Sequence, residues 1–213
     1  MIKEIYTLYV ERWHFFLDLT WEHLQISLTS IVIATIVGLG LGIMISMYRK
    51  GSSTVLGLTT FIYTIPSIAL FGFLIPFSGI GNTTAIIALS IYALLPMVHN
   101  TYTGIIGIDK EIIEAARGMG STTFQILYKI QIPLAFPVIL SGIRNMVVMT
   151  IALTGIAAFI GAGGLGVAIY RGITTNNSAM TIAGSLLIAL LALLADWGVG
   201  RYEKYIKRKR KLL

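Results

Sequence analysis

The sequence predicts an all-α integral membrane protein with five transmembrane helices, an outside N-terminus and an inside C-terminus. Of its 213 residues, 56% are hydrophobic and only 12% are charged. The mean hydropathy is +0.84, far from the value for an average soluble domain. Several apolar runs are about as long as the ~20 residues that a helix needs to cross the hydrocarbon core. Positive charge lies mainly on one side of these runs, which predicts the orientation.

Residues 1–22 are expected to form an amphipathic helix at the membrane interface. Apolar residues recur there at spacings of three and four, with acidic residues between them, a pattern typical of interfacial helices. No cleavable signal peptide is evident, because the first long apolar run starts only near Leu24.

Residues 23–200 are expected to form the transmembrane domain. The expected spans are residues 24–47, 55–77, 83–103, 137–159 and 179–199. Gly38, Gly40 and Gly42 in the first span allow another helix to approach closely. Pro66 and Pro96 are expected to kink the second and third spans. Both helices should then face protein or a cavity, where the freed carbonyl groups find partners.

The distribution of basic residues predicts which side each loop occupies. With five spans, twelve of the sixteen lysines and arginines lie on the same side of the membrane as the C-terminus, and three lie on the opposite side. Such an excess of basic residues is typical of the inside. Seven of the twelve crowd into the tail, residues 201–213. A net charge of +7 is therefore better explained by anchoring at the membrane surface than by nucleic-acid binding.

The polar segment between the third and fourth spans, residues 108–137, is predicted to form a helix-turn-helix on the inside. Asp109 is a suitable N-cap for a first helix, which two glycines should end. Thr122, followed three residues later by a glutamine, fits a capping box. The second helix should be closed by Pro133. A solvated loop is the alternative.

This segment resembles the cytoplasmic EAA loop of permeases from binding-protein-dependent ABC importers. That pattern is E-A-A, three residues, G, nine residues and I-x-L-P, and the spacing here is complete, with isoleucine replacing leucine at position 132. The resemblance implies that the loop sits in a groove of a separate ATPase and passes its closure to the transmembrane helices. The residues expected to take part in coupling are Glu114, Ala115, Ala116, Gly118, Gly120, Ile130 and Pro133.

Further stretches narrow the resemblance to permeases for osmoprotectants such as glycine betaine, carnitine and choline. They include T-W-E-H-L-Q-I-S-L, I-P-S-I-A-L-F-G-F-L-I-P and L-P-M-V-H-N-T-Y-T-G-I. The resemblance implies a type I ABC importer permease (MetI-like) fold in a bacterial plasma membrane. It also implies a second permease subunit, the same or similar, two ATP-binding subunits and an external substrate-binding protein. No cofactor is expected in this chain.

Five residues within the spans are candidates for the translocation pathway: Tyr63, Tyr92, Asn100, Arg144 and Asn145. The tyrosines could pack within the bundle or hold a cationic substrate by cation–π contact. A charged side chain inside a span needs a partner. Arg144 is therefore expected either to pair with Asp196, which lies at a similar depth, or to contact substrate. Asn145 could line the pathway or bond a neighbouring helix.

A glycine run after the fourth span contains a G-x-G-x-x-G match at Gly161, Gly163, Gly164 and Gly166. Dinucleotide binding is excluded, because no preceding strand, βαβ unit or downstream acidic residue accompanies it. The run is expected to form either a plain turn or an outer loop that acts as a gate. The three histidines show no metal-site spacing, and no catalytic set or phosphate-binding loop is present. We therefore expect neither a metal site nor an enzyme.

Overall fold

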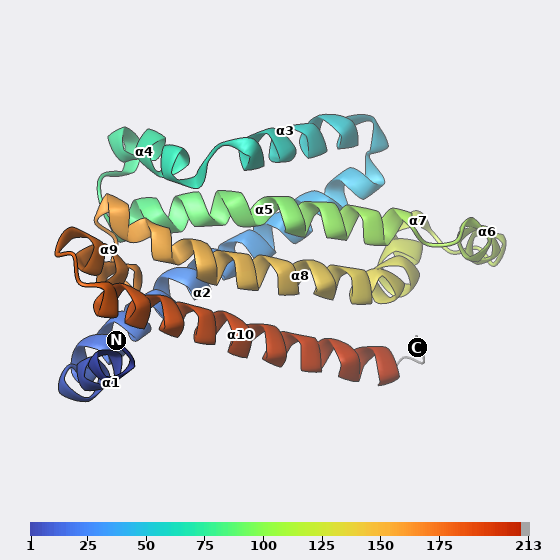
Figure 1. Cartoon of the computed structure of the whole chain (residues 1–213). Coiled ribbons are helices and arrows are strands. Elements are labelled where there is room, and N and C mark those ends of the chain that lie inside the picture. Colours follow the sequence, from blue (N-terminus) through green and yellow to red (C-terminus); the bar gives the residue numbers. More distant parts are fainter. Residues whose placement is uncertain (210–213) are drawn as a thin grey trace.

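The computed structural model describes residues 1–209 and is almost entirely helical (Figure 1). In chain order the elements are α1 (Ile2–Glu11), α2 (Trp13–Met47), η1 (Arg49–Gly51), α3 (Ser52–Thr64), α4 (Ser67–Ser78), α5 (Asn82–Ile106), α6 (Lys110–Gly118), α7 (Thr123–Ile126), η2 (Leu127–Gln131), α8 (Ile132–Thr154), η3 (Gly155–Ile160), α9 (Gly166–Thr174) and α10 (Ser178–Lys209). This confirms the all-α fold class.

Four segments are long and apolar enough to cross a membrane by themselves: α2, α5, the run Thr123–Ile160 that contains α8, and α10. The pair α3 and α4 would make a fifth span, with a bend of 100° between its halves. The expectation of five spans therefore holds when this bent pair is counted as one. The bend is much sharper than the kink that the sequence predicted at Pro66.

The bend arises because the helix is broken outright rather than kinked. Ile65 is extended, with φ −67° and ψ 129°, as expected for a residue that precedes proline. The hydroxyl of Tyr92 donates a hydrogen bond to the Ile65 carbonyl, so the polar group exposed by the break is satisfied within the bundle. Pro96 has a milder effect, since α5 continues through it as one helix.

The N-terminal helix ends earlier than predicted. α1 stops at Glu11, Arg12 is non-helical, and α2 then runs unbroken from Trp13 to Met47. The second half of the predicted amphipathic helix is therefore the start of the first span. Phe16 and Leu19 are buried there, whereas Trp13, Leu17 and Trp21 are exposed. α1 itself buries no residue but is tied to α10 by Tyr9, whose hydroxyl donates to the Ala183 carbonyl at 2.8 Å.

Close packing of α2 against α5 depends on two of the three predicted glycines. A β-carbon built on Gly38 would lie 2.7 Å from Met97 Cβ, and one on Gly42 would lie 2.5 Å from Thr101 Cβ. Gly40 has open space around it. A spacing of four places the first two on one helix face, and Gly40 lies off that face. The α2–α5 contact therefore needs small residues at every fourth position.

The two ends of the bundle are built differently. Figure 1 shows α6 and the last turns of α10 at one end, with α1, η3 and α9 at the other. We call these the α6 end and the α9 end. The short helix α9 and the continuation of α10 as a helix to Lys209 were not expected from the sequence. The side of the membrane on which each end lies stays a prediction.

Candidate coupling segment and translocation surface

The first helix of the coupling segment, residues 108–137, begins and ends as predicted. The Asp109 carboxylate accepts a hydrogen bond from the Glu111 amide at 3.0 Å, which caps α6. At the other end Gly120 has φ +82°. Its amide donates to the Arg117 carbonyl at 2.9 Å, and the Ser121 amide donates to the Ala116 carbonyl at 3.1 Å. These two bonds form a Schellman turn with glycine at the left-handed position.

The second helix begins as predicted but does not end where the sequence indicated. Thr122 and Gln125 form a reciprocal capping box at the start of α7. Pro133 was expected to close this helix, which is wrong. The chain passes through the π-helical turn η2 directly into α8, and Pro133 lies in the first turn of α8. A proline is tolerated at this point because the π-helical turn directly before it changes the backbone hydrogen-bond pattern.

This continuity joins the coupling segment to the membrane span without a flexible loop. The turn η2 is anchored through Leu127, which is buried, as is the preceding Ile126. Movement imposed on α7 would therefore reach α8 through a continuous helical path. π-helical turns inside α-helices occur frequently at functional sites.

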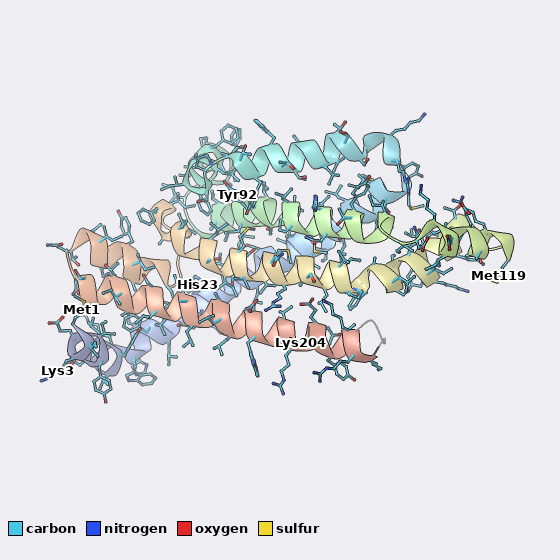
Figure 2. All side chains as sticks on the ribbon, turned by 45° about the vertical axis from the view of Figure 1, so that its right-hand side comes forward. Met1, Lys3, His23, Tyr92, Met119 and Lys204 are labelled. Carbon is cyan, nitrogen blue, oxygen red and sulfur yellow. The ribbon has the colours of Figure 1, made fainter. Side chains whose placement is uncertain are left out.

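The coupling segment also presents unpartnered apolar surface. The exposed fraction is 80% for Met119, 68% for Phe124 and 66% for Tyr128, and Met119 lies at the far tip of the segment (Figure 2). Among the predicted coupling residues, Glu114, Ala115, Gly118 and Gly120 are exposed, Ile130 and Pro133 are half-buried, and Ala116 is buried. Exposed aromatic and apolar residues at the end of a bundle favour a protein partner.

Glu114 faces a pocket of about 350 Å³ between the α6 end of α2 and the coupling segment. Arg49, Lys110 and Arg117 line the same pocket, and Glu114 is the only carboxylate among its lining residues. The EAA-like glutamate thus shares this pocket with three basic residues, although it forms no ion pair within 4.0 Å among residues 1–209.

Three of the five predicted pathway residues meet in a second pocket of about 400 Å³ between α3, α5 and α8. Its lining residues are Thr60, Tyr63, Leu95, Pro96, His99, Asn100, Asn145 and Met149. Tyr63 was expected from the second span, Asn100 from the third and Asn145 from the fourth. His99 and Met149 were missed, because nothing in the sequence pattern separates them from ordinary packing residues.

Tyr92 does not line this pocket but packs against Tyr63, which does. It is 4% exposed, and its ring contacts the Tyr63 ring edge to face with centroids 6.0 Å apart. Its hydroxyl holds the broken backbone at Ile65. Figure 2 shows Tyr92 beneath the junction of α3 and α4. Tyr92 therefore positions the wall that carries Tyr63.

Arg144 does not join the pocket, and the predicted pair with Asp196 is confirmed. The Arg144 Nε donates to Asp196 Oδ1 at 2.6 Å and a terminal nitrogen donates to Oδ2 at 2.7 Å. The neighbouring Asn145 lines the pocket while Arg144 faces α10, because successive residues on a helix point about 100° apart.

Two further residues, Glu203 and Lys207, complete an ion cluster with Arg144 and Asp196 that the sequence did not predict. Glu203 is buried and lies 3.5 Å from Arg144 Nη1. It also accepts hydrogen bonds from Lys207 at 2.7 Å and from Ser141 at 2.9 Å. The spacing of four between Glu203 and Lys207 was the available signal, since such pairs face one another on a helix. It was overlooked because these residues were assigned to a basic tail rather than to the end of α10.

The glycine run forms a tight turn at the α9 end that touches two other elements. Gly161 and Gly164 have positive φ, 73° and 89°. The Gly163 amide donates to the Asn82 side chain at 2.8 Å, and the Gly164 amide donates to Glu22 Oε2 at 3.1 Å. The run therefore ties the start of α5 to α2. Its action as a gate stays a prediction.

No group of three or more histidine, cysteine, aspartate or glutamate side chains suited to a metal ion occurs within residues 1–209.

Residues 30–208 match the family described as "binding-protein-dependent transport system inner membrane component". The chain is 43% identical over 208 residues to the osmoprotectant import permease protein OsmW of Salmonella typhimurium, covering 92% of this chain and 97% of that one. It is 40% identical over 199 residues to the carnitine transport permease protein OpuCB of Listeria monocytogenes, covering 93% and 91%. It is 39% identical over 212 residues to the glycine betaine/carnitine/choline transport system permease protein OpuCD of Bacillus subtilis, covering 99% and 93%.

Among solved structures, the fold resembles a chain of the MetNI methionine ABC transporter in an inward-facing conformation. The TM-score is 0.83 at 24% identity, covering 90% of this chain and 95% of that one. This likeness confirms the MetI-like fold. Together with the apolar helices and the matches along nearly the whole length, it shows that the chain is a multi-pass protein of the bacterial plasma membrane and a non-catalytic member of the binding-protein-dependent permease family.

Proposed function

We propose that the chain is the membrane-spanning subunit of an ATP-driven importer for a quaternary-ammonium osmoprotectant such as glycine betaine, carnitine or choline. The observation that carries the proposal is the identity of 39–43% along nearly the whole chain to permeases named for carnitine, glycine betaine, choline and osmoprotectants. The family description implies a binding protein as partner. The solved structure that the fold resembles belongs to an ABC transporter, which implies an ATPase as a second partner.

The coupling segment supports this division of labour. A capped helix, a Schellman turn and a capping box hold a short rigid element outside the spans, and a continuous helical path joins it to α8. Its exposed apolar residues provide a contact surface for a separate ATPase. The proposed assembly contains two permease chains, the same or similar, two ATP-binding subunits and one external binding protein. The α6 end then lies inside the cell.

The pocket between α3, α5 and α8 suits passage of a quaternary ammonium ion. Such an ion has no N–H to donate, so an aromatic face and a thioether are suitable contacts. Tyr63 and Met149 provide these, and Asn100 and Asn145 can bond a substrate carboxylate or hydroxyl. None of the eight lining residues is an aspartate, glutamate, lysine or arginine.

The test is uptake by the purified importer in proteoliposomes. The tagged chain is expressed in its native host, purified in mild detergent and analysed by mass spectrometry for an ATPase, a second permease and a binding protein. Labelled carnitine, glycine betaine and choline are then offered with and without ATP, and methionine serves as a control substrate. Uptake of at least one quaternary ammonium compound that requires ATP is expected. Uptake driven by an ion gradient without ATP, or of methionine alone, would overturn the proposal.

A further inference from the structure

A pocket beside the C-terminal half of α10 has no role in the proposed transport mechanism. It has a volume of about 540 Å³ and lies between the ion cluster and the end of the helix. Its lining residues are Arg144, Leu193, Leu194, Asp196, Trp197, Gly200, Arg201 and Lys204. Residues 193, 197, 200 and 204 follow one face of the helix at spacings of three and four.

The charges around this pocket leave two cations without acidic partners. Arg144 and Lys207 are matched by Asp196 and Glu203, so the ion cluster is neutral. Arg201 stacks on the Trp197 ring at 5.3 Å. Within residues 1–209 neither Arg201 nor Lys204 lies within 4.0 Å of a carboxylate. The pocket therefore carries a surplus of positive charge at the end of α10, where Figure 2 shows Lys204.

Along α10 the pocket changes from apolar to aromatic to cationic, which matches the order of acyl chain, interface and headgroup in an anionic phospholipid. Leu193 and Leu194, which are 67% and 56% exposed, form the part nearer the middle of the span. Trp197 follows, at the level where aromatic residues gather in membranes, and the two cations come last. From residue 193 to residue 204 the helix rises by about 16 Å, which is long enough to reach from hydrocarbon to headgroup.

Gly200 keeps the floor of the pocket open. A β-carbon at this position would lie 2.9 Å from the Arg144 guanidinium carbon. Because Gly200 has no side chain, a ligand in the pocket can approach the Arg144–Asp196 pair. The charge of Asp196 is already compensated by Arg144. The carboxylate therefore presents little net repulsion to an approaching anion.

We infer that this pocket binds the headgroup of an anionic phospholipid, with its phosphate between Arg201 and Lys204 and its acyl chains along Leu193 and Leu194. A lipid is the occupant because the cations continue directly into an exposed apolar groove on a membrane span. The site depends on the order of residues along α10 and not on which substrate is transported.

The test measures lipid binding to the purified, delipidated importer by native mass spectrometry. Phosphatidylglycerol, phosphatidylcholine with the same acyl chains and inorganic phosphate are titrated separately. Each basic residue near an anionic surface contributes about fivefold in affinity. The double variant R201Q/K204Q should therefore bind phosphatidylglycerol about 25-fold more weakly, with binding of phosphatidylcholine unchanged. If the double variant does not assemble, K204Q alone should lose about fivefold.

The matched control is R208Q/K209Q, which removes the same charge from exposed positions of the same helix outside the pocket. Its loss should be smaller than that of R201Q/K204Q, because neither residue lines the pocket. Equal losses in both double variants would refute a specific site. Equal binding of phosphatidylcholine and phosphatidylglycerol by the wild type would show an apolar groove without anion recognition. Saturation by inorganic phosphate at the same residues without lipid binding would point to a free anion. Disulfide formation between two copies of L194C would show that a second chain covers the face. Each of these results overturns the proposal.

Discussion

Replacing Gly120 by alanine tests whether the Schellman turn of the coupling segment connects ATP hydrolysis to transport. Gly120 has φ +82°, and no heavy atom lies within 4 Å of a β-carbon built on it. The substitution therefore creates no clash, and its cost comes from the backbone alone. A left-handed conformation costs a non-glycine residue about 1–2 kcal/mol. That energy shifts the equilibrium between the native turn and alternative turns by about 5- to 30-fold.

Gly118 provides a control with the same chemical change. It is the last residue of α6, does not have positive φ, and also has open space around it. Alanine is a better helix former than glycine by up to about 1 kcal/mol. G118A should therefore hold or stabilise the segment while G120A loosens it. Asparagine tolerates the left-handed conformation better than alanine does, so G120N should fall between G120A and the wild type.

The assay measures ATP hydrolysis and substrate accumulation in the same proteoliposomes. In G120A the turn no longer fixes the orientation of α6 relative to α7, which continues into α8. Less substrate should therefore be transported for each ATP consumed. G120L should abolish uptake, since a bulky side chain is added to the same strained backbone. Both variants should assemble normally, because Gly120 is exposed and lies outside the spans.

Three results would count against this explanation. G120A could transport as much substrate per ATP as the wild type. G118A could lose as much coupling as G120A. G120A could also fail to co-purify with the ATPase, which would indicate a defect of assembly rather than of coupling. The first two would remove the turn from the mechanism. The third would reassign it to docking.

Three further predictions concern the bundle. I2C should react with an impermeant thiol reagent in intact cells and M119C should not, because twelve basic residues against three place the α6 end inside; the opposite labelling pattern would reverse the topology. R144L and D196L should each lower the melting temperature of the complex, and the double variant should lose less than their sum, since the two residues share a bidentate pair; additive losses would exclude the pair. Y92F should destabilise the bundle by about 1 kcal/mol, measured by thermal unfolding in detergent, because the Ile65 carbonyl loses its donor; an unchanged melting temperature would show that this bond does not hold the break.

Much of the fold was predictable because its signals are local. Long apolar runs identify spans, since an unpaired backbone group is too costly in lipid. Capping at Asp109, Thr122 and Gln125 was predictable for the same reason, because each cap acts within three residues of itself. The Gly120 turn belongs to this class as well.

Other features depended on contacts between distant residues. Pro66 favours an extended Ile65, and the Ile65 carbonyl freed by the break accepts a hydrogen bond from the Tyr92 hydroxyl of another span. Pro133 fails to end its helix because the buried Leu127 and the π-helical turn carry the chain onward into α8. The residues next to Pro66 and Pro133 therefore indicate a perturbed helix, but they do not show how far the chain departs from it.

The candidate sites divide in the same way. The coupling segment could be found from sequence because its residues are contiguous and their spacing is set by local geometry. The pairing of Arg144 with Asp196 was predictable as well, because a charge inside a span needs an opposite charge at similar depth. The pocket lined by Tyr63, Asn100 and Asn145 required the tertiary structure, since helix rotation decides which side chains face one space. The part of Glu203 in the ion cluster likewise emerged only once α10 was seen to continue past the membrane span and pack against α8.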